Sequence, residues 1–321
     1  MSQPLLALRD LQLDFRTGAG WARVVDGVSL TLHAGETLAL VGESGCGKSV
    51  TSLSISRLLP MPPARYSGGS IHVQGRDILQ ASSAELREIR GGVVSYVFQE
   101  PGASLNPVFR VGNQILEALQ LHQPQRANTA EVIRLLKLVG IPAPESRVRD
   151  YPHQLSGGMQ QRIMIAMALA SEPKLLVADE PTTALDVTIQ AQILDLLLDL
   201  KRRLGMAILL ITHNLGIVGD LADRVAVMYA GQVVEEAPAR ELLRNPRHPY
   251  TQALMRSVPE LGHPAERLRT IAGTVPAPGQ WPVGCRFAPR CPVARTDCSQ
   301  HPPRVAEVTA GHTVRCPYWK S

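Results

Sequence analysis

Apolar and polar residues alternate along the first part of the chain. Leu5–Phe15 and Val24–Leu32 place apolar residues at every second position, and this period of two is typical of antiparallel β-strands with one buried face. Thr37–Val41 is almost continuously apolar, which predicts a strand buried on both faces. Ser67–Val73 and Gly92–Gln99 are predicted as further strands.

Helical spacing of apolar residues follows in the middle of the chain. Val111–Leu121 and Thr129–Val139 repeat apolar residues every three or four positions, as a helix with one buried face does. The second run ends at Gly140, and Pro142 follows, which together form a helix stop signal. We therefore predict a helical subdomain over about residues 101–171.

Strands and helices then alternate. Lys174–Ala178 is predicted as a buried strand, Thr188–Arg203 as a helix and Ala207–Thr212 as the next strand. Alternation of this kind indicates a mostly parallel sheet covered by helices on both faces. The predicted fold class is therefore α/β.

A phosphate-binding motif joins the third strand to a helix predicted over Ser49–Leu59. Gly42–Ser49 fits G-x-x-x-x-G-K-[ST] at every fixed position, with a strand before it and a helix after it, as a P-loop requires. A glycine-rich turn without a ligand is the alternative. In a P-loop, backbone N–H groups and the helix N-terminus point at phosphate, Lys48 contacts the β- and γ-phosphates, and the Ser49 hydroxyl ligates Mg²⁺. The residues expected to contact the nucleotide are Gly42, Ser44, Gly45, Cys46, Gly47, Lys48, Ser49 and Val50.

Two aromatic residues near the start are candidates for stacking on the nucleotide base. Phe15 is the first candidate and Trp21 the second. The alternative is that both pack against the sheet.

Polar residues with the chemistry of phosphoryl transfer stand at predicted strand ends. Asp179 and Glu180 follow an apolar strand, Gln99 ends another, and His213 ends a third. Asp179 can hold Mg²⁺, and Glu180 can orient or deprotonate the attacking water. Gln99 can reach both the Mg²⁺ and the water, and His213 can donate a hydrogen bond to the γ-phosphate. A solvated acidic strand end is the alternative for the two carboxylates.

Composition narrows the class of protein. The 321 residues suggest about two domains, and 45% hydrophobic with 19% charged residues is ordinary for a globular chain. The net charge is +5 without a Lys/Arg run, and aromatics are 4%, so no nucleic-acid surface is predicted. No apolar run reaches the ~18 residues of a membrane span. Met1–Pro4 lacks the basic and apolar start of a signal peptide, so we expect a cytoplasmic protein.

These motifs together resemble the ATP-binding subunit of ABC transporters. Leu155–Met159 resembles the signature that separates this family from other P-loop enzymes, and the resemblance runs from about Leu5 to Val234. One position departs from the family pattern, because Met159 stands where Gln is most common. The motifs occur in the family's order: the P-loop, Gln99 of the Q-loop, the signature, Asp179 and Glu180 of Walker B, Asp186 of the D-loop and His213 of the switch.

The resemblance implies a P-loop NTPase fold of the ABC cassette type over residues 1–235. This fold has a mostly parallel core sheet, an antiparallel β edge and a helical subdomain. It also implies that two ATP-binding subunits form a dimer with two ATP molecules between them. Ser156, Gly157 and Gly158 of one subunit would then face the γ-phosphate bound by the other, so Met159 is expected to be harmless.

Residues 236–321 have a different character. Thirteen of the 25 prolines fall in these last 86 residues, so we expect a loop-rich extension that does not continue the sheet. Asn245–Thr251 and Phe98–Pro107 resemble segments of the dipeptide, oligopeptide and nickel permease ATPases. Within Asn245–Thr251 we expect Pro249 to begin a helix, and we expect a structural role for His248.

Four of the five cysteines lie in this extension, at C-x5-C-x6-C-x17-C spacing. Disulfides are disfavoured in a reducing cytoplasm, and no C-x2-C pair of common zinc sites is present. The residues alone leave zinc and iron–sulfur about equal, with free thiols as a third option. Gly284–Pro292 resembles the region that carries a [4Fe–4S] cluster in some of these permease ATPases, which favours the cluster, with zinc as the alternative. The expected ligands are Cys285, Cys291, Cys298 and Cys316.

The resemblance implies an energy-coupling ATPase of an importer for di- or oligopeptides, bound at the cytoplasmic face of the plasma (inner) membrane. Implied partners are two transmembrane permease subunits, a second related ATP-binding subunit in a heterodimer, and an extracytoplasmic solute-binding protein. Alternatives are an importer of nickel or another solute, a non-transport ABC ATPase, and a P-loop kinase or GTPase. The chain has a single cassette and no coiled-coil insertion, which argues against a non-transport ABC ATPase. The signature and His213 argue against a P-loop kinase or GTPase. We expect the nucleotide site to have a core of its own, apart from the cysteines.

Overall fold

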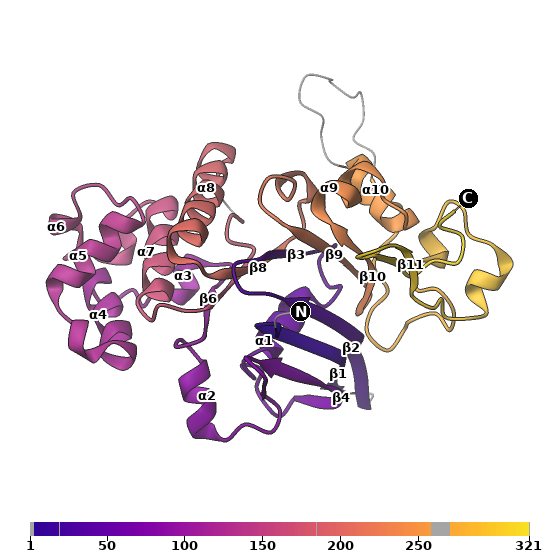
Figure 1. The fold of residues 1–321 in the computed structure, drawn as a ribbon, viewed down its shortest axis with the longest axis horizontal. Coiled ribbons are helices and arrows are strands. Elements are labelled where there is room, and N and C mark those ends of the chain that lie inside the picture. The colour runs from indigo at the N-terminus through magenta and orange to yellow at the C-terminus, as the bar shows by residue number, and fades with distance from the viewer. Residues whose placement is uncertain (1–2, 19, 184, 258–269, 321) are drawn as a thin grey trace. The chain divides into compact units, whose positions relative to one another are not determined.

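The structure is a computed structural model that describes residues 3–18, 20–183, 185–257 and 270–320. The chain divides into two compact units (Figure 1). Unit 1 comprises residues 1–32, 37–79 and 211–321, and unit 2 comprises residues 33–36 and 80–210. Unit 1 thus joins the start of the chain to the C-terminal extension, residues 236–321. The predicted domain boundary at residue 235 stays a prediction.

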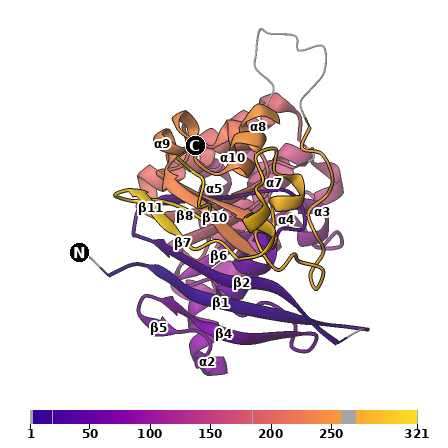
Figure 2. The same cartoon turned by 90° about the vertical axis from the view of Figure 1, so that its right-hand side faces the viewer.

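Unit 1 contains a four-stranded antiparallel sheet (Figure 2). Its strand order is β2-β1-β4-β5. Along β1, Leu11 and Leu13 are buried, which is the alternation that the sequence indicated. This sheet is the predicted antiparallel edge of the cassette. The strands are β1 (Leu6–Thr17), β2 (Gly20–Leu32), β4 (Ala64–Val73) and β5 (Arg76–Asp77).

A second run of strands in unit 1 has the order β11-β12-β10-β9-β3. β3 and β9 pair in parallel, and the other pairs are antiparallel. The expectation that the extension does not continue the sheet is wrong, because β12 pairs with β10. Residues 306–314 contain no proline, so both strands of a hairpin can donate ladder hydrogen bonds. The strands are β3 (Thr37–Val41), β9 (Arg224–Tyr229), β10 (Gln232–Pro238), β11 (Ala306–Thr309) and β12 (His312–Val314).

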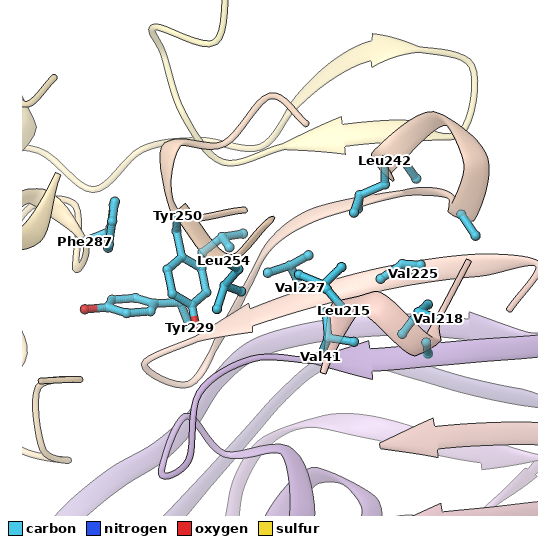
Figure 3. Packing of buried hydrophobic residues seen from close by; sticks show 14 of the residues in the cluster. Val41, Leu215, Val218, Val225, Val227, Tyr229, Leu242, Tyr250, Leu254 and Phe287 are labelled. Atoms are coloured by element: carbon cyan, nitrogen blue, oxygen red, sulfur yellow. The ribbon is translucent and has the colours of Figure 1, made fainter. Parts of the chain in front are cut away.

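The core of unit 1 joins the P-loop strand to the extension. Val41 of β3 and Val227 of β9 lie in one buried cluster with Tyr250, Leu254 and Phe287 (Figure 3). The expectation of a separate core for the nucleotide site is therefore wrong. Large apolar side chains of the extension pack against the apolar residues of β3 and β9 in this cluster. Its helices in this region are α9 (Ala239–Arg244) and α10 (Pro249–Ser257).

Unit 2 contains three strands in the order β8-β7-β6, and β6 pairs with β7 in parallel. Its division from unit 1 falls inside β8, after Leu210. α7 is the central helix, because it packs against α3, α4, α5 and α8. The strands are β6 (Val94–Val97), β7 (Leu175–Asp179) and β8 (Ala207–Thr212). The helices are α2 (Ser83–Ile89), α3 (Pro101–Ser104), α4 (Val111–His122), α5 (Thr129–Leu138), α6 (Pro144–Arg147), α7 (Gly157–Leu169) and α8 (Val187–Leu204).

Most predicted elements are confirmed to within a few residues. The helix after the P-loop, α1 (Lys48–Ser54), is shorter than predicted. Arg57, with a positive φ of 50°, lies three residues beyond its end, and this left-handed conformation does not continue a right-handed helix. In the ranges that the structure describes, no helix is long and apolar enough to cross a bilayer.

Candidate functional site

The P-loop lies in unit 1, between the buried strand β3 and helix α1. Gly42 and Gly47 have positive φ angles of 155° and 106°, and a Cβ atom at either would meet Met228 within 3 Å. Only glycine fits both the backbone angle and the space. The fixed glycines of the motif therefore let the loop pack closely over β9.

Lys48 is buried at the first position of α1, with 5% of its surface exposed. Its Nζ donates to the carbonyl oxygens of Gly42 at 2.7 Å and Glu43 at 3.1 Å. These bonds curl the loop around the ammonium group. Ser44, Gly45 and Ser49 are exposed on the same loop. A buried cation inside a ring of backbone groups is the arrangement that a phosphate-binding loop requires.

Helix α1 begins without a side-chain cap, because its N-cap residue is Gly47. The N–H groups of its first turn are therefore not bonded by a capping side chain, and they carry the partial positive charge of a helix N-terminus. Thr51 donates both its N–H and its hydroxyl to the Gly47 carbonyl at 2.9 Å. These two bonds hold the end of the loop on the helix.

The Walker B carboxylates lie in unit 2. β7 is buried throughout and ends at Asp179. Glu180 follows in a left-handed conformation with φ 46°, and such strain in a residue other than glycine is concentrated at functional sites. Its Oε2 accepts hydrogen bonds from Thr183 Oγ1 at 2.8 Å and Gln99 Nε2 at 3.3 Å. The structure thus brings Gln99 and Glu180 together, as their proposed shared work on one water requires.

The signature segment opens helix α7. Ser156 is the N-cap, and its Oγ accepts from the Met159 N–H at 3.4 Å. Gly158 lies against α8, because a Cβ there would stand 2.8 Å from Ile189. Asp186 caps α8 by accepting from the Ile189 N–H at 2.9 Å. Signature and D-loop residues therefore meet in unit 2, with Ser156 and Gly157 exposed.

The remaining predicted nucleotide contacts lie in unit 1. His213 is exposed directly after β8. Phe15 is half-buried on β1 and pairs with Ala22 of β2. The guanidinium of Arg65 stacks over Trp21 at 4.1 Å from the ring centroid. Base stacking by Phe15 or Trp21 stays a prediction.

The four cysteines of the extension line one cavity of about 420 Å³ in unit 1. A backbone hydrogen bond connects two segments of the cavity wall: the Cys285 N–H donates to the Cys298 carbonyl at 2.6 Å. The rest of the lining combines apolar residues such as Phe287 and Pro317 with the polar residues Asp297, His301 and Arg304. Among the described residues, no group of three or more His, Cys, Asp or Glu side chains is arranged to hold a single metal ion.

Burial raises the pKa of the thiols of Cys285, Cys291 and Cys316, the last to about 11. The neighbouring thiols raise these pKa values further. Without a metal, these side chains stay protonated at neutral pH.

His248 serves the fold, as expected. It is fully buried, and its pKa is lowered to about 3, chiefly by burial. The neutral ring accepts a hydrogen bond at Nδ1 from the Tyr250 N–H at 3.0 Å. His248 therefore caps the start of α10, where Pro249 is the first residue.

Four residues at or near the site were missed from the sequence. Thr183 bonds Glu180, and Arg290 and Tyr250 of the extension bond Glu43 of the P-loop. Tyr250 lies in the segment Asn245–Thr251, so that motif could have drawn attention to it. Nothing in the sequence pattern marks Arg290.

Comparison with known proteins matches both parts of the chain. Residues 25–183 match the ABC transporter family, and residues 234–298 match the oligopeptide/dipeptide transporter C-terminal region. A protein of Brucella abortus (strain 2308), whose name describes a peptide import ATP-binding protein, is 48% identical over 98% of this chain and 95% of its own length. A protein of Sinorhizobium fredii, named as a peptide ABC transporter ATP-binding protein, is 50% identical over 99% of this chain and 95% of its own length.

Solved structures match the cassette. An ATP-binding cassette in a dimeric post-hydrolysis state with ADP and phosphate is 26% identical, with a TM-score of 0.64, over 73% of this chain and 99% of its own. CbiO1 from Clostridium perfringens, part of the CbiONQ ABC transporter complex, is 28% identical with a TM-score of 0.65, over 76% of this chain and 92% of its own. Both structures have the ABC cassette fold, so the predicted fold class is confirmed.

Proposed function

Because this chain belongs to the ABC transporter ATP-binding family, in its oligopeptide/dipeptide branch, we propose that it hydrolyses ATP to drive the import of peptides. The observation that carries this proposal is the identity of 48–50% to two peptide-transporter ATP-binding proteins over 98–99% of the chain. That similarity includes the C-terminal extension as well as the cassette. An importer of nickel or another solute stays the alternative.

The chain's own residues divide the chemistry between them. Lys48 and the exposed N–H groups of the P-loop bind the triphosphate, and Ser49 and Asp179 hold its Mg²⁺. Glu180, bonded by Gln99 and Thr183, takes the proton of the attacking water or orients it. His213 donates to the γ-phosphate. Bound Mg²⁺ neutralises charge on the phosphates.

The proposed assembly is a dimer of related ATP-binding subunits on two membrane-spanning permease subunits at the cytoplasmic face of the plasma membrane. Ser156 and Gly157 are exposed at the start of α7. The N-terminus of this helix can therefore contact the γ-phosphate of ATP bound by a second subunit. An extracytoplasmic binding protein would deliver the peptide. Nucleotide-dependent closure and opening of the dimer would then drive the transport cycle.

Peptide uptake in whole cells tests the proposal. A strain lacking this chain should lose uptake of a radiolabelled tri- to pentapeptide series, and expression of the wild-type chain should restore it. The Glu180→Gln variant, expressed to the same level, should not restore it. Peptide uptake equal to that of the parent strain in the deletion strain would refute peptide import, and loss of nickel uptake alone would establish the alternative.

We also propose that Cys285, Cys291, Cys298 and Cys316 hold a [4Fe–4S] cluster. The cavity that these four cysteines line supports this proposal. The cluster would cross-link four segments of a Pro-rich extension through thiolate ligation.

Metal analysis of protein purified without oxygen tests the cluster. We expect about four irons per chain, and Cys298→Ser should lower the iron content and the melting temperature. Cys46→Ser is the matched control, because Cys46 is buried in the P-loop outside the cavity, and its iron content should equal that of the wild type. Stoichiometric zinc without iron, or four freely alkylated thiols in the folded protein, would refute the cluster.

A further inference from the structure

We propose that Arg290 and Tyr250 of the C-terminal extension are positioning residues for ATP binding, because they hold Glu43 in the P-loop. Glu43 is the second residue of the motif and varies freely in its consensus. The inference needs only that the P-loop binds ATP, and it is independent of the transported solute and of the proposed cluster.

Arg290 grips the Glu43 carboxylate with two parallel hydrogen bonds. Nη1 donates to Oε2 at 2.7 Å, and Nη2 donates to Oε1 at 2.9 Å. The side chain of Arg290 is 5% exposed, against 29% for Glu43. A bidentate pair of this kind is both strong and directional.

Arg290 is itself held by hydrogen bonds to the extension and to β9. Its Nε donates to the Ala272 carbonyl at 2.9 Å, and Nη1 reaches the Tyr229 hydroxyl at 3.3 Å. The guanidinium therefore arrives at Glu43 in a fixed orientation, with little conformational entropy left to lose. Arg290 also directly precedes Cys291, so the cavity wall and the P-loop contact share one short segment.

Tyr250 holds the backbone of the same residue. Its hydroxyl accepts from the Glu43 N–H at 2.9 Å. The ring is buried and packs against Tyr229, at 4.6 Å between centroids, and Phe287, at 5.3 Å (Figure 3). The Glu43 carbonyl accepts from Lys48 at 3.1 Å. The carboxylate, N–H and carbonyl of Glu43 are thus all bonded, and Glu43 links the extension to the phosphate-binding lysine.

The opposite charges of Arg290 and Glu43 give their ion pair a second role. A negative charge on the P-loop opposes the binding of a triphosphate, and the opposition is strong where the loop is partly shielded from water. Arg290 places a positive charge against that carboxylate. If Arg290 is removed, Glu43 keeps its charge, and its side chain can turn toward Lys48 or the phosphates. The expected result is weaker ATP binding.

A second set of contacts links the extension to the P-loop indirectly, through Ala230 and Gly231. Arg286 pairs with Asp26, donates to the Ala230 carbonyl at 2.6 Å, and stacks on Trp281 at 3.6 Å from the ring centroid. Gly231, which follows Ala230 in the chain, donates its N–H to the Cys46 carbonyl at 2.8 Å. The extension therefore braces the P-loop near both Glu43 and Cys46.

The test measures binding of the fluorescent analogue mant-ATP with Mg²⁺ to the full-length chain, and kcat in the assembled complex. Arg290→Gln should raise Kd about tenfold or more, with kcat at saturating ATP changed less than about threefold. Tyr250→Phe, which keeps the ring and loses the acceptor, should raise Kd about fivefold. Arg295→Gln is the matched control, because its guanidinium stacks on Tyr318 in the same extension, and its Kd should equal that of the wild type.

A double variant separates charge positioning from a structural role. Glu43→Gln with Arg290→Gln should bind mant-ATP within about threefold of Glu43→Gln alone, because the uncompensated carboxylate is gone. A purely structural role of Arg290 would leave the double variant as weak as Arg290→Gln. That outcome, or an unchanged Kd in Arg290→Gln, would overturn the proposal.

Discussion

Glu180 stands one residue beyond the buried end of β7, where its backbone adopts a left-handed conformation. Thr183 and Gln99 both donate hydrogen bonds to its Oε2 atom, so the carboxylate is held in a defined orientation. An oriented carboxylate can supply the proton transfer that water attack on a phosphate needs.

Removing this base should separate binding from turnover. Glu180→Gln should keep the wild-type affinity for ATP and lower kcat by about 10²–10⁴-fold, because the amide accepts no proton. The variant should also trap the ATP-bound dimer, measured by size-exclusion chromatography. Glu117→Gln, an exposed carboxylate on α4, should leave kcat unchanged. Near-normal ATPase activity of Glu180→Gln in the assembled complex would refute the assignment.

Lys48 contributes to binding instead of proton transfer. Lys48→Ala should weaken ATP affinity by about 10- to 100-fold, since it removes the cation that contacts the phosphates. It also removes the donor that curls Gly42 and Glu43 around the site. Isothermal titration with ATP measures the loss, and a retained affinity would show that the lysine is not a phosphate ligand.

Among the elements, the four-stranded sheet depends on one buried charge. Asp14 of β1 accepts hydrogen bonds from Arg23 of β2 at 2.5 Å and from Arg65 of β4 at 3.0 Å. Burial by itself raises the pKa of Asp14, but the bonds from Arg23 and Arg65 outweigh it and hold the pKa below its usual value. The ionised form is thus stabilised in the folded state, and this contribution is lost as pH falls through the folded pKa.

Asp14→Asn should therefore lower the free energy of unfolding by about 1–3 kcal/mol, seen as a lower melting temperature at pH 7. The difference from the wild type should shrink below pH 4. Asp199→Asn, which breaks an exposed pair with Arg203 on α8, should cost less than about 0.5 kcal/mol. Equal melting temperatures for Asp14→Asn and the wild type would show that Asp14 does not join the strands.

We propose that the helical segment around Pro101–Leu121 contacts a membrane subunit. Its Val108 and Phe109 side chains are 72% and 52% exposed, and the segment begins two residues after Gln99. A photo-cross-linking amino acid at Ser104 or Phe109 should join a cytoplasmic loop of a permease subunit, identified by mass spectrometry. The same probe at Gln125 should yield less. Cross-links only from the C-terminal extension would refute this assignment.

Element prediction succeeded where the pattern is local. β3, α1 and the P-loop between them could be placed from the sequence, because strand, glycine turn and helix are consecutive. The hairpin of β11 and β12 was missed, since prolines flank its nine residues and the residues of β10 that pair with β12 lie 77–79 positions earlier. Composition averaged over the whole extension concealed a short segment that can form strands.

At the scale of the whole molecule, site residues within a local motif could be predicted, and those that depend on contacts between distant parts of the chain could not. Lys48, Asp179 and Glu180 were found because motifs set their spacing. Arg290 contacts Glu43 across 247 residues, and no periodicity or motif spacing encodes that contact. The buried cluster that includes Val41, Tyr250 and Phe287 makes the extension part of the core. The extension therefore supports the P-loop, in addition to any role of its cysteines.

The central claim is that ATP hydrolysis by this chain drives peptide import. The most direct measurement follows ATP hydrolysis and accumulation of a labelled peptide in the same proteoliposomes, which contain the permease subunits, both ATP-binding subunits and the binding protein. Wild-type complex should accumulate peptide only with hydrolysable ATP, and Glu180→Gln should abolish both signals. Peptide accumulation that is unchanged in Glu180→Gln, or ATP hydrolysis that never responds to the peptide-loaded binding protein, would contradict the claim.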